Sequence, residues 1–255
     1  MSAIDNPEPA LQVAGSAGPN ACWSCGDMRA AHFCESCGKL QPATPTDFFS
    51  FFGLPRKLNI DIHALEQEFY KLSRKLHPDV HARANQQEQR WSLEKSSQLN
   101  DAYRTLREPI ARTEYLLNLE GVQLEEQSKA ATEKARQSGE QKKQVVPPEL
   151  LEEVFELNMQ LEEARMSRKM GEQDASITEE LRATKNSLEA KYQALDNELH
   201  GYWADWDRLI SMPGCVKSRD MWAVQRKAML DSMLGLLNRR SYIRNLLRDV
   251  NEVLQ

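Results

Sequence analysis

Two short cysteine pairs near the N-terminus of this 255-residue chain have the spacing of a metal site. Cys22 and Cys25 form one Cys-x-x-Cys pair, Cys34 and Cys37 form the second, and a glycine follows each pair. Such a turn directs two thiolates at one ion, and the glycine lets backbone N–H groups turn toward the sulfurs. Two turns together complete a tetrahedral set of thiolates. The sequence therefore predicts a metal site made of four cysteines.

Zinc is the expected metal, as one structural ion, because it is redox-silent and favours closed tetrahedral sites; iron would also fit four thiolates. The stretch between the pairs, residues 26–33, is short and leaves this segment almost no core of its own. That favours a rubredoxin-like loop closure stabilised by the metal. A pair of disulfides or a redox-active dithiol is the alternative interpretation. His32 could replace a thiolate, although four cysteines already fill the site.

The second feature that could take part in chemistry or recognition is a basic helix that ends at a proline. It occupies residues 65–79, LEQEFYKLSRKLHPD. Its apolar residues recur at helical spacing and form one core-facing stripe: Leu65, Phe69, Leu72 and Leu76. The basic residues that this spacing turns outward are Lys71, Arg74 and Lys75. Because Pro78 disfavours helical backbone at His77, the helix should stop there. We expect His77, Pro78 and Asp79 to lie exposed beside the positive patch.

This helix and its surroundings resemble the J-domain of DnaJ-type co-chaperones. The resemblance rests on the combination of the basic helix, the His77-Pro78-Asp79 tripeptide, a polar loop and a second helix with LNDAY at residues 99–103. The alternative for the tripeptide alone is an ordinary helix stop and turn.

The flanking stretches resemble one subfamily, the HscB co-chaperones of iron-sulfur cluster assembly. They are DFFSFFGLP, residues 47–55, and EPIARTEYLL, residues 108–117. The resemblance is dense over residues 47–119 and looser over residues 148–255. The cysteine-rich start is similar to that of eukaryotic members of the subfamily.

The composition and periodicity predict an all-α protein, since Leu, Glu, Gln, Arg and Lys dominate most of the chain. We expect a disordered leader (1–20), the metal-binding segment (21–41), a J-domain helical hairpin (46–119), a disordered insertion (120–148) and a C-terminal three-helix bundle (149–255). A coiled-coil oligomer is the alternative to the bundle, and the loop-forming residues between its helices disfavour it.

By resemblance, the chain would be a co-chaperone and not an enzyme. His77-Pro78-Asp79, with Lys71, Arg74 and Lys75, would dock on an ATP-bound chaperone of the heat shock protein 70 class and speed its ATP hydrolysis. The residues themselves support this, because a positive patch steers toward an acidic surface and Asp79 can accept charge-assisted hydrogen bonds from a partner arginine. No catalytic set and no glycine-rich phosphate loop stands out in the sequence.

The resemblance also implies that the bundle binds an IscU-type scaffold protein. The implied contact residues are Leu151, Phe155, Glu156 and Met159 on the first bundle helix and Tyr242 on the last. Two positions depart from the family pattern, since Glu152 stands where an apolar residue is usual and Met159 where an acid is usual. The alternative for Leu151 and Phe155 is the bundle core.

Charge and hydropathy limit the partners. The net charge of −5 gives no global basic field for nucleic-acid binding, and no apolar run approaches the roughly 18 residues of a membrane span. We therefore expect neither nucleic acid nor a membrane as a partner, and leave a homodimer open. The rival functions are a general J-domain protein that delivers unfolded clients and a zinc or redox protein that uses the cysteines.

The resemblance implies the mitochondrial matrix, with the cytoplasm as the alternative. Residues 1–20 contain Asp5 and Glu8 and no basic residue, whereas a mitochondrial transit peptide is rich in arginine and poor in acid. Either a presequence has been removed from this chain or the protein is not imported in that way.

Overall fold

The structure is a computed structural model that describes residues 21–27, 32–122, 150–170, 175–211 and 219–254. Contacts divide the chain into two compact units: residues 1–53 with 62–104, and residues 54–61 with 105–255. These units group residues by contact, and the domain boundaries given above remain predictions. The predicted disordered leader and nearly all of the predicted disordered insertion lie outside the described residues.

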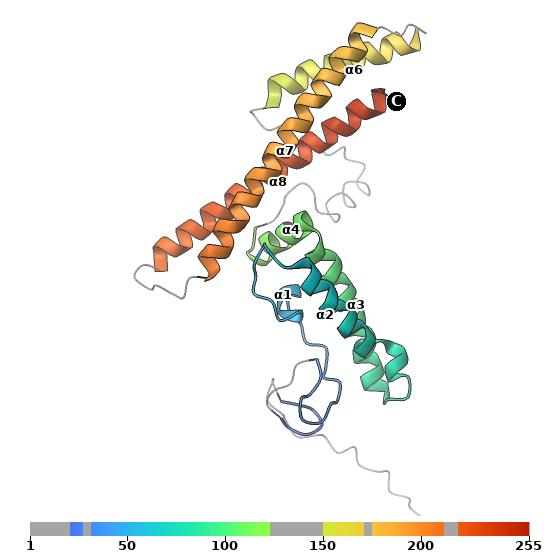
Figure 1. Cartoon of the computed structure of the whole chain (residues 1–255), viewed down its shortest axis with the longest axis vertical. Helices are drawn as coiled ribbons and strands as arrows, with labels where there is room; N and C mark the ends of the chain where they lie inside the picture. The colour runs from blue at the N-terminus through green and yellow to red at the C-terminus, as the bar shows by residue number, and fades with distance from the viewer. Residues whose placement is uncertain (1–20, 28–31, 123–149, 171–174, 212–218, 255) are drawn as a thin grey trace, which may run out of the picture. The chain divides into compact units, whose positions relative to one another are not determined.

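The first unit contains a helical hairpin (Figure 1). Its elements are α1 (Phe48–Phe51), α2 (Ile62–Leu76), the 3-10 turn η1 (Pro78–His81) and α3 (Gln86–Arg107), whose last residues belong to the second unit. Asp47 caps α1, because its carboxylate accepts the Ser50 N–H at 3.0 Å. Asn85 caps α3 in the same way by accepting the Glu88 N–H at 2.8 Å.

The stripe predicted for the basic helix is the buried face of α2. Leu65, Leu72 and Leu76 are 3%, 6% and 0% exposed, and Phe69 is partly buried against the same core. Burial of a leucine side chain contributes about 1.5–3 kcal/mol, so this stripe is a main source of the hairpin's stability. Trp91 and Leu99 of α3 complete the core from the other side of the hairpin.

The cysteine-rich segment shares this core. Leu40 belongs to the buried cluster, at 1% exposed, and the rings of Trp23 and Phe33 pack against it. Phe33 and Leu40 also form an isolated antiparallel bridge. The segment therefore gains most of its apolar burial from the helices and not from a core of its own.

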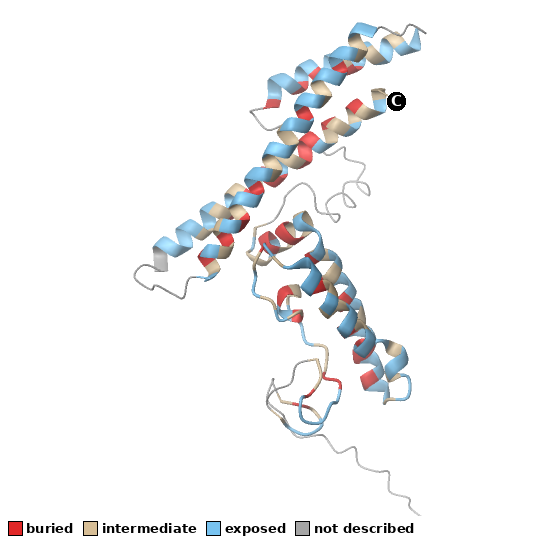
Figure 2. Cartoon of the chain, in the orientation of Figure 1, coloured by how far each residue is buried: buried red, intermediate tan, exposed pale blue. Residues whose placement is uncertain are grey.

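The second unit contains a helical bundle. Its elements are α4 (Pro109–Leu119), α6 (Leu151–Lys169), α7 (Ala175–Ser211) and α8 (Arg219–Leu254). The two long helices α7 and α8 run side by side, and α6 packs against both (Figure 1). Where the three helices meet, they bury a core that includes Leu157, Leu188 and Ile243. Figure 2 shows the buried residues along the sides of α7 and α8 that face each other.

Residues 54–61 belong to the second unit because side chains of α7 bind their backbone. The Asp207 carboxylate accepts the N–H of Leu58 at 2.7 Å and that of Asn59 at 2.9 Å. The indole N–H of Trp206 donates to the Arg56 carbonyl at 2.9 Å. These bonds join residues that lie about 150 positions apart in the chain.

The all-α prediction is confirmed, with a helical hairpin, a three-helix bundle and a cysteine turn segment in the part of the chain that the structure covers. None of the helices described is both long and apolar enough to cross a membrane.

Candidate functional sites

The tripeptide His77-Pro78-Asp79 forms an exposed corner directly after α2. His77 has φ −59° and ψ 132°, which is the extended conformation that a following proline enforces, and α2 ends at Leu76 as predicted. The side chains of His77 and Asp79 are 57% and 91% exposed. His77 Nδ1 accepts the Asp79 N–H at 3.3 Å. This local bond orders the corner while most of the Asp79 carboxylate stays accessible.

Side chains behind the corner satisfy the last carbonyls of α2, which have no partner within the helix. Ser92 and Ser96 of α3 both donate to the Leu76 carbonyl at 2.7 Å. His81 Nε2 lies 2.9 Å from the Lys75 carbonyl. These bonds determine where the chain leaves α2. These bonds could not be predicted from the sequence, because two serines on α3 and one histidine after the corner have no recognisable pattern.

The predicted basic patch lies on the outer side of α2, next to the corner. Lys71, Arg74 and Lys75 are all exposed. Lys71 forms an exposed ion pair with Glu68 at 2.9 Å, whereas Arg74 and Lys75 lie in the last turn, where cations interact favourably with the helix dipole. The structure therefore brings the patch and the tripeptide together at one end of α2.

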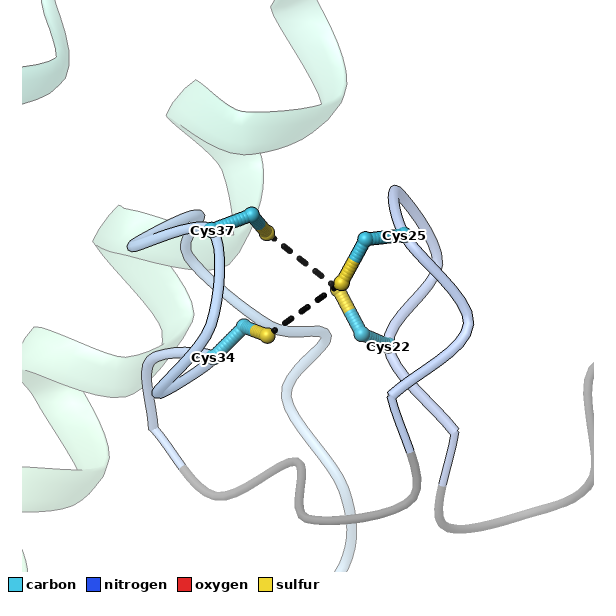
Figure 3. A group of neighbouring side chains, drawn as sticks. All are labelled: Cys22, Cys25, Cys34 and Cys37. Atoms are coloured by element: carbon cyan, nitrogen blue, oxygen red, sulfur yellow. Dashed lines mark hydrogen bonds between the residues drawn. The ribbon is translucent and has the colours of Figure 1, made fainter.

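The four predicted cysteines converge on one point (Figure 3). Their Sγ atoms all lie within 4.8 Å of one another, with Cys22 and Cys37 3.6 Å apart and Cys25 and Cys34 3.5 Å apart. Four sulfurs bound to one tetrahedral zinc at about 2.3 Å would lie about 3.8 Å from one another. All four are free thiols, so the donor set fits a metal ion and not a pair of disulfides.

The two cysteine turns have the same backbone. The Gly26 N–H donates to the Cys22 carbonyl and the Gly38 N–H donates to the Cys34 carbonyl, both at 2.9 Å. The two glycines have φ of +79° and +71°, a region that side chains with a Cβ enter only under strain. The glycine after each pair is therefore needed to close the turn that aims the sulfurs inward.

Hydrogen bonds favour a thiolate at the buried Cys22. Burial is the strongest single influence and raises the pKa of Cys22, but the backbone N–H groups of Cys25 and Ser24 and the thiols of Cys37 and Cys25 together outweigh it and lower that pKa to about 6. Gln41 adds an amide donor 3.3 Å from the same sulfur. The Asp27 N–H acts to lower the pKa of Cys25, but the neighbouring thiols raise it to about 12. The thiols therefore do not all ionise unless a cation joins them, and metal binding would release protons.

A row of exposed apolar side chains runs along α6. The α6 row consists of Leu151, Phe155, Met159 and Met166, which are 54%, 69%, 60% and 60% exposed. The spacing of four, four and seven residues places them on one side of the helix. The buried side of α6 consists of Val154, Leu157 and Leu161. The core interpretation of Leu151 and Phe155 is therefore wrong, and Glu156 lies exposed beside the row.

Tyr242 does not join the α6 row. Its side chain is 7% exposed and belongs to the bundle core with Leu188 and Ile243. The resemblance implied a partner contact for this ring, but the structure fills the interior of the bundle with it. The α8 pattern could not reveal this, because an aromatic at a helical position suits a core and a binding surface equally well.

Replacing Tyr242 by alanine should therefore destabilise the bundle. Truncating an aromatic residue in a core leaves a cavity and lowers the free energy of unfolding by about 3–5 kcal/mol. Urea denaturation followed by circular dichroism should show an earlier transition for Tyr242→Ala, whereas Tyr242→Phe, which keeps the ring, should stay near wild type. An unchanged midpoint for Tyr242→Ala would contradict the core position of this ring.

The basic helix, the exposed His-Pro-Asp corner and the second helix of the hairpin define a J-domain protein, and the DnaJ domain family matches residues 47–115. The Iron-sulfur cluster co-chaperone protein HscB of Mus musculus is 29% identical over 192 residues, which cover 73% of this chain and 76% of that protein. The Co-chaperone protein HscB homolog of Cupriavidus taiwanensis is 33% identical over 159 residues, 61% of this chain and 82% of that protein.

The chain belongs to the HscB family of co-chaperones. The crystal structure of human co-chaperone protein HscB has the same fold, with a TM-score of 0.56 at 21% identity, and the match covers 91% of this chain and 97% of that one. The resemblance drawn from the tripeptide and its flanks is thus confirmed, and the role of the chain is that of a co-chaperone.

Proposed function

We propose that the chain stimulates the ATPase of a heat shock protein 70 class chaperone and delivers to it an IscU-type scaffold protein, so that an iron-sulfur cluster can be transferred. The chain would act through these partners and would catalyse no reaction itself. We expect it to work in the mitochondrial matrix, with the cytoplasm as the alternative.

The observation that carries this proposal is the exposed corner at the end of a basic helix. Asp79, 91% exposed on an ordered corner, can accept charge-assisted hydrogen bonds from a partner arginine. Arg74 and Lys75 beside it would attract an acidic surface and raise the association rate. Because Ser92 and Ser96 already hold the end of α2, docking orders little additional chain.

The α6 row supports the second part of the proposal. Single exposed apolar residues are common on protein surfaces, but several of them on one helix face are typical of a protein-binding surface. The exposed acids Glu152 and Glu156 border the row. A partner that fits this face has an apolar patch edged by basic residues.

Steady-state ATP hydrolysis by the purified chaperone tests the proposal. The full-length chain should raise the turnover, and adding the scaffold protein should raise it further. A turnover that stays at the basal value both with and without the scaffold would contradict the proposal.

The alternative is a general J-domain protein that delivers unfolded clients. A pull-down that offers a folded IscU-type scaffold and denatured peptides to the same immobilised chain separates the two functions. We expect selective capture of the folded scaffold. Capture of denatured peptides alone would support the alternative.

We also propose that Cys22, Cys25, Cys34 and Cys37 hold one structural zinc ion, which would supply a cross-link and no redox chemistry. Metal analysis of the purified protein should find about one zinc per chain that survives mild oxidant. Cys37→Ser should lower the zinc content, whereas Ser36→Ala, next to it, should leave the content unchanged. Bound iron or a thiol pair that titrates with oxidant would support the redox alternative.

A further inference from the structure

One aromatic pair joins the four-cysteine segment to the chain that follows the His77-Pro78-Asp79 corner. Phe33 directly precedes Cys34, and its ring stacks on that of His81 with the centroids 6.4 Å apart and an angle of 20° between the planes. Stacked aromatic pairs at such separations contribute about 0.5–1.5 kcal/mol. His81 is the last residue of η1, the 3-10 turn that contains Asp79.

His81 connects this contact to the end of α2. Its Nε2 must donate to the Lys75 carbonyl, 2.9 Å away, because a carbonyl oxygen can only accept. The backbone of the corner continues from there, with the Val80 N–H donating to the His77 carbonyl at 3.0 Å. The His81 ring is therefore held by Phe33 on its face and by α2 at its edge. The position of this ring therefore constrains the backbone of residues 77–81.

The turn that contains Cys34 and Cys37 positions Phe33. The Cys34 N–H donates to the Lys39 carbonyl at 2.9 Å, and Phe33 bridges to Leu40, so the two ends of the turn lie side by side. A metal bound by Cys34 and Cys37 would hold this turn closed. Without the metal, the turn keeps its backbone bonds and the packing of Phe33 on the core, but loses the cross-link that fixes Phe33 against His81.

Further contacts fasten the segment to α3, the helix that lies behind the corner. They are the ring pair Trp23–Trp91 at 5.6 Å, the ion pair Lys39–Glu88 at 3.6 Å and the contact His32–Lys95 at 3.3 Å. The Glu88 side chain is only 6% exposed, although its partner Lys39 is 50% exposed, so water still reaches this ion pair from the lysine side. The segment is thus attached at several points and can act as a fixed support.

We propose that Phe33 and His81 are positioning residues that couple metal binding at the four cysteines to the placement of the His77-Pro78-Asp79 corner. The ATPase test of this proposal rests on the function proposed above, whereas its hydrogen-exchange test does not. If the corner is correctly placed in only a fraction of molecules, the apparent affinity for the partner falls by that fraction while the bound complex is unchanged. Loss of the contact between Phe33 and His81 should therefore raise the chain concentration that gives half-maximal stimulation of the chaperone ATPase. The maximal stimulation should not change.

Phe33→Ala in the full-length, metal-bound chain should raise the half-maximal concentration about 3- to 10-fold at unchanged maximal ATPase stimulation. Phe33→Tyr keeps the stacked ring and should behave as wild type. The matched control is Phe52→Ala, which truncates another ring that is partly buried against the same core but contacts Phe51 instead of His81. An equal shift for Phe33→Ala and Phe52→Ala would overturn the proposal, because it would indicate general destabilisation.

Two changes at His81 separate its two contacts. His81→Gln keeps an N–H donor for the Lys75 carbonyl and removes the ring, whereas His81→Phe keeps the ring and removes the donor. Adding Phe33→Ala should have no further effect in the His81→Gln background, where the stack is already lost, but a full effect in the His81→Phe background. Equal effects of Phe33→Ala in both backgrounds would overturn the coupling.

Hydrogen exchange without any chaperone provides the structural test. Amides of residues 77–84 should exchange faster in Phe33→Ala, and also after a chelator removes the metal from wild type, whereas amides of α7 should not change. Unchanged exchange at residues 77–84 in both samples would overturn the proposal. If exchange changes as expected but wild type does not stimulate the chaperone, the proposed function fails and the support role of Phe33 and His81 stands.

Discussion

Replacing Asp79 by asparagine should remove most of the stimulation of the chaperone ATPase at chain concentrations that just saturate the response to wild type. The amide has the same shape as the carboxylate but lacks the charge that attracts a partner arginine. Removing one partner of a charge pair that docking buries costs about 2–5 kcal/mol, which corresponds to binding weakened about 30-fold or more.

The fold should not change in this variant. The Asp79 side chain is 91% exposed, and the neighbouring His77 is exposed as well. Surface pairs of this kind add little to stability. Thermal unfolding of Asp79→Asn should therefore match wild type. Asp231→Asn, the same chemical change at an exposed position on α8, is the matched control and should stimulate normally. Full stimulation by Asp79→Asn would refute the role of the corner.

Replacing Leu151 and Phe155 together by alanine should weaken binding of the scaffold protein about 100-fold or more. Anchor residues at protein interfaces each contribute about 2 kcal/mol or more when a partner buries them. The two side chains are 54% and 69% exposed in the free chain, so their truncation removes little of the bundle core. Titration calorimetry with the scaffold measures the affinity, and far-UV circular dichroism checks that the helical content is unchanged.

Met221→Ala combined with Val224→Ala is the control for this variant. Both residues are exposed on α8, at 64% and 68%, and the double change removes exposed apolar side chains away from the α6 row. Scaffold affinity should stay at the wild-type value in this control. If the two double variants weaken binding equally, the α6 row is not the binding surface.

The basic helix could be predicted almost completely from local sequence. The spacing of Leu65, Leu72 and Leu76 defines its buried face, and Pro78 defines its end. Both effects act between residues a few positions apart, through helix periodicity and through the steric demand of the proline ring. The cysteine turns could be predicted for the same reason, since each needs only two cysteines and the glycine after them.

The bundle surface could be predicted only in part. The first bundle helix carries more apolar residues than one buried face requires, and this excess indicated a binding surface. The pattern alone could not show that Val154 is covered and Phe155 is not, because both sides of α6 are apolar. The position of Tyr242 in the core could not be predicted either, because an aromatic residue on α8 suits a core and a binding surface equally well.

The amino-acid sequence by itself determined the helices, the proline-limited corner and the four-thiol donor set, because short-range sterics and residue spacing are enough to specify them. Only the tertiary structure decided which apolar face of α6 stays exposed, that Tyr242 is buried and that Phe33 meets His81. Those outcomes depend on packing between segments that are distant in the chain, and such contacts leave no periodic signal in the sequence.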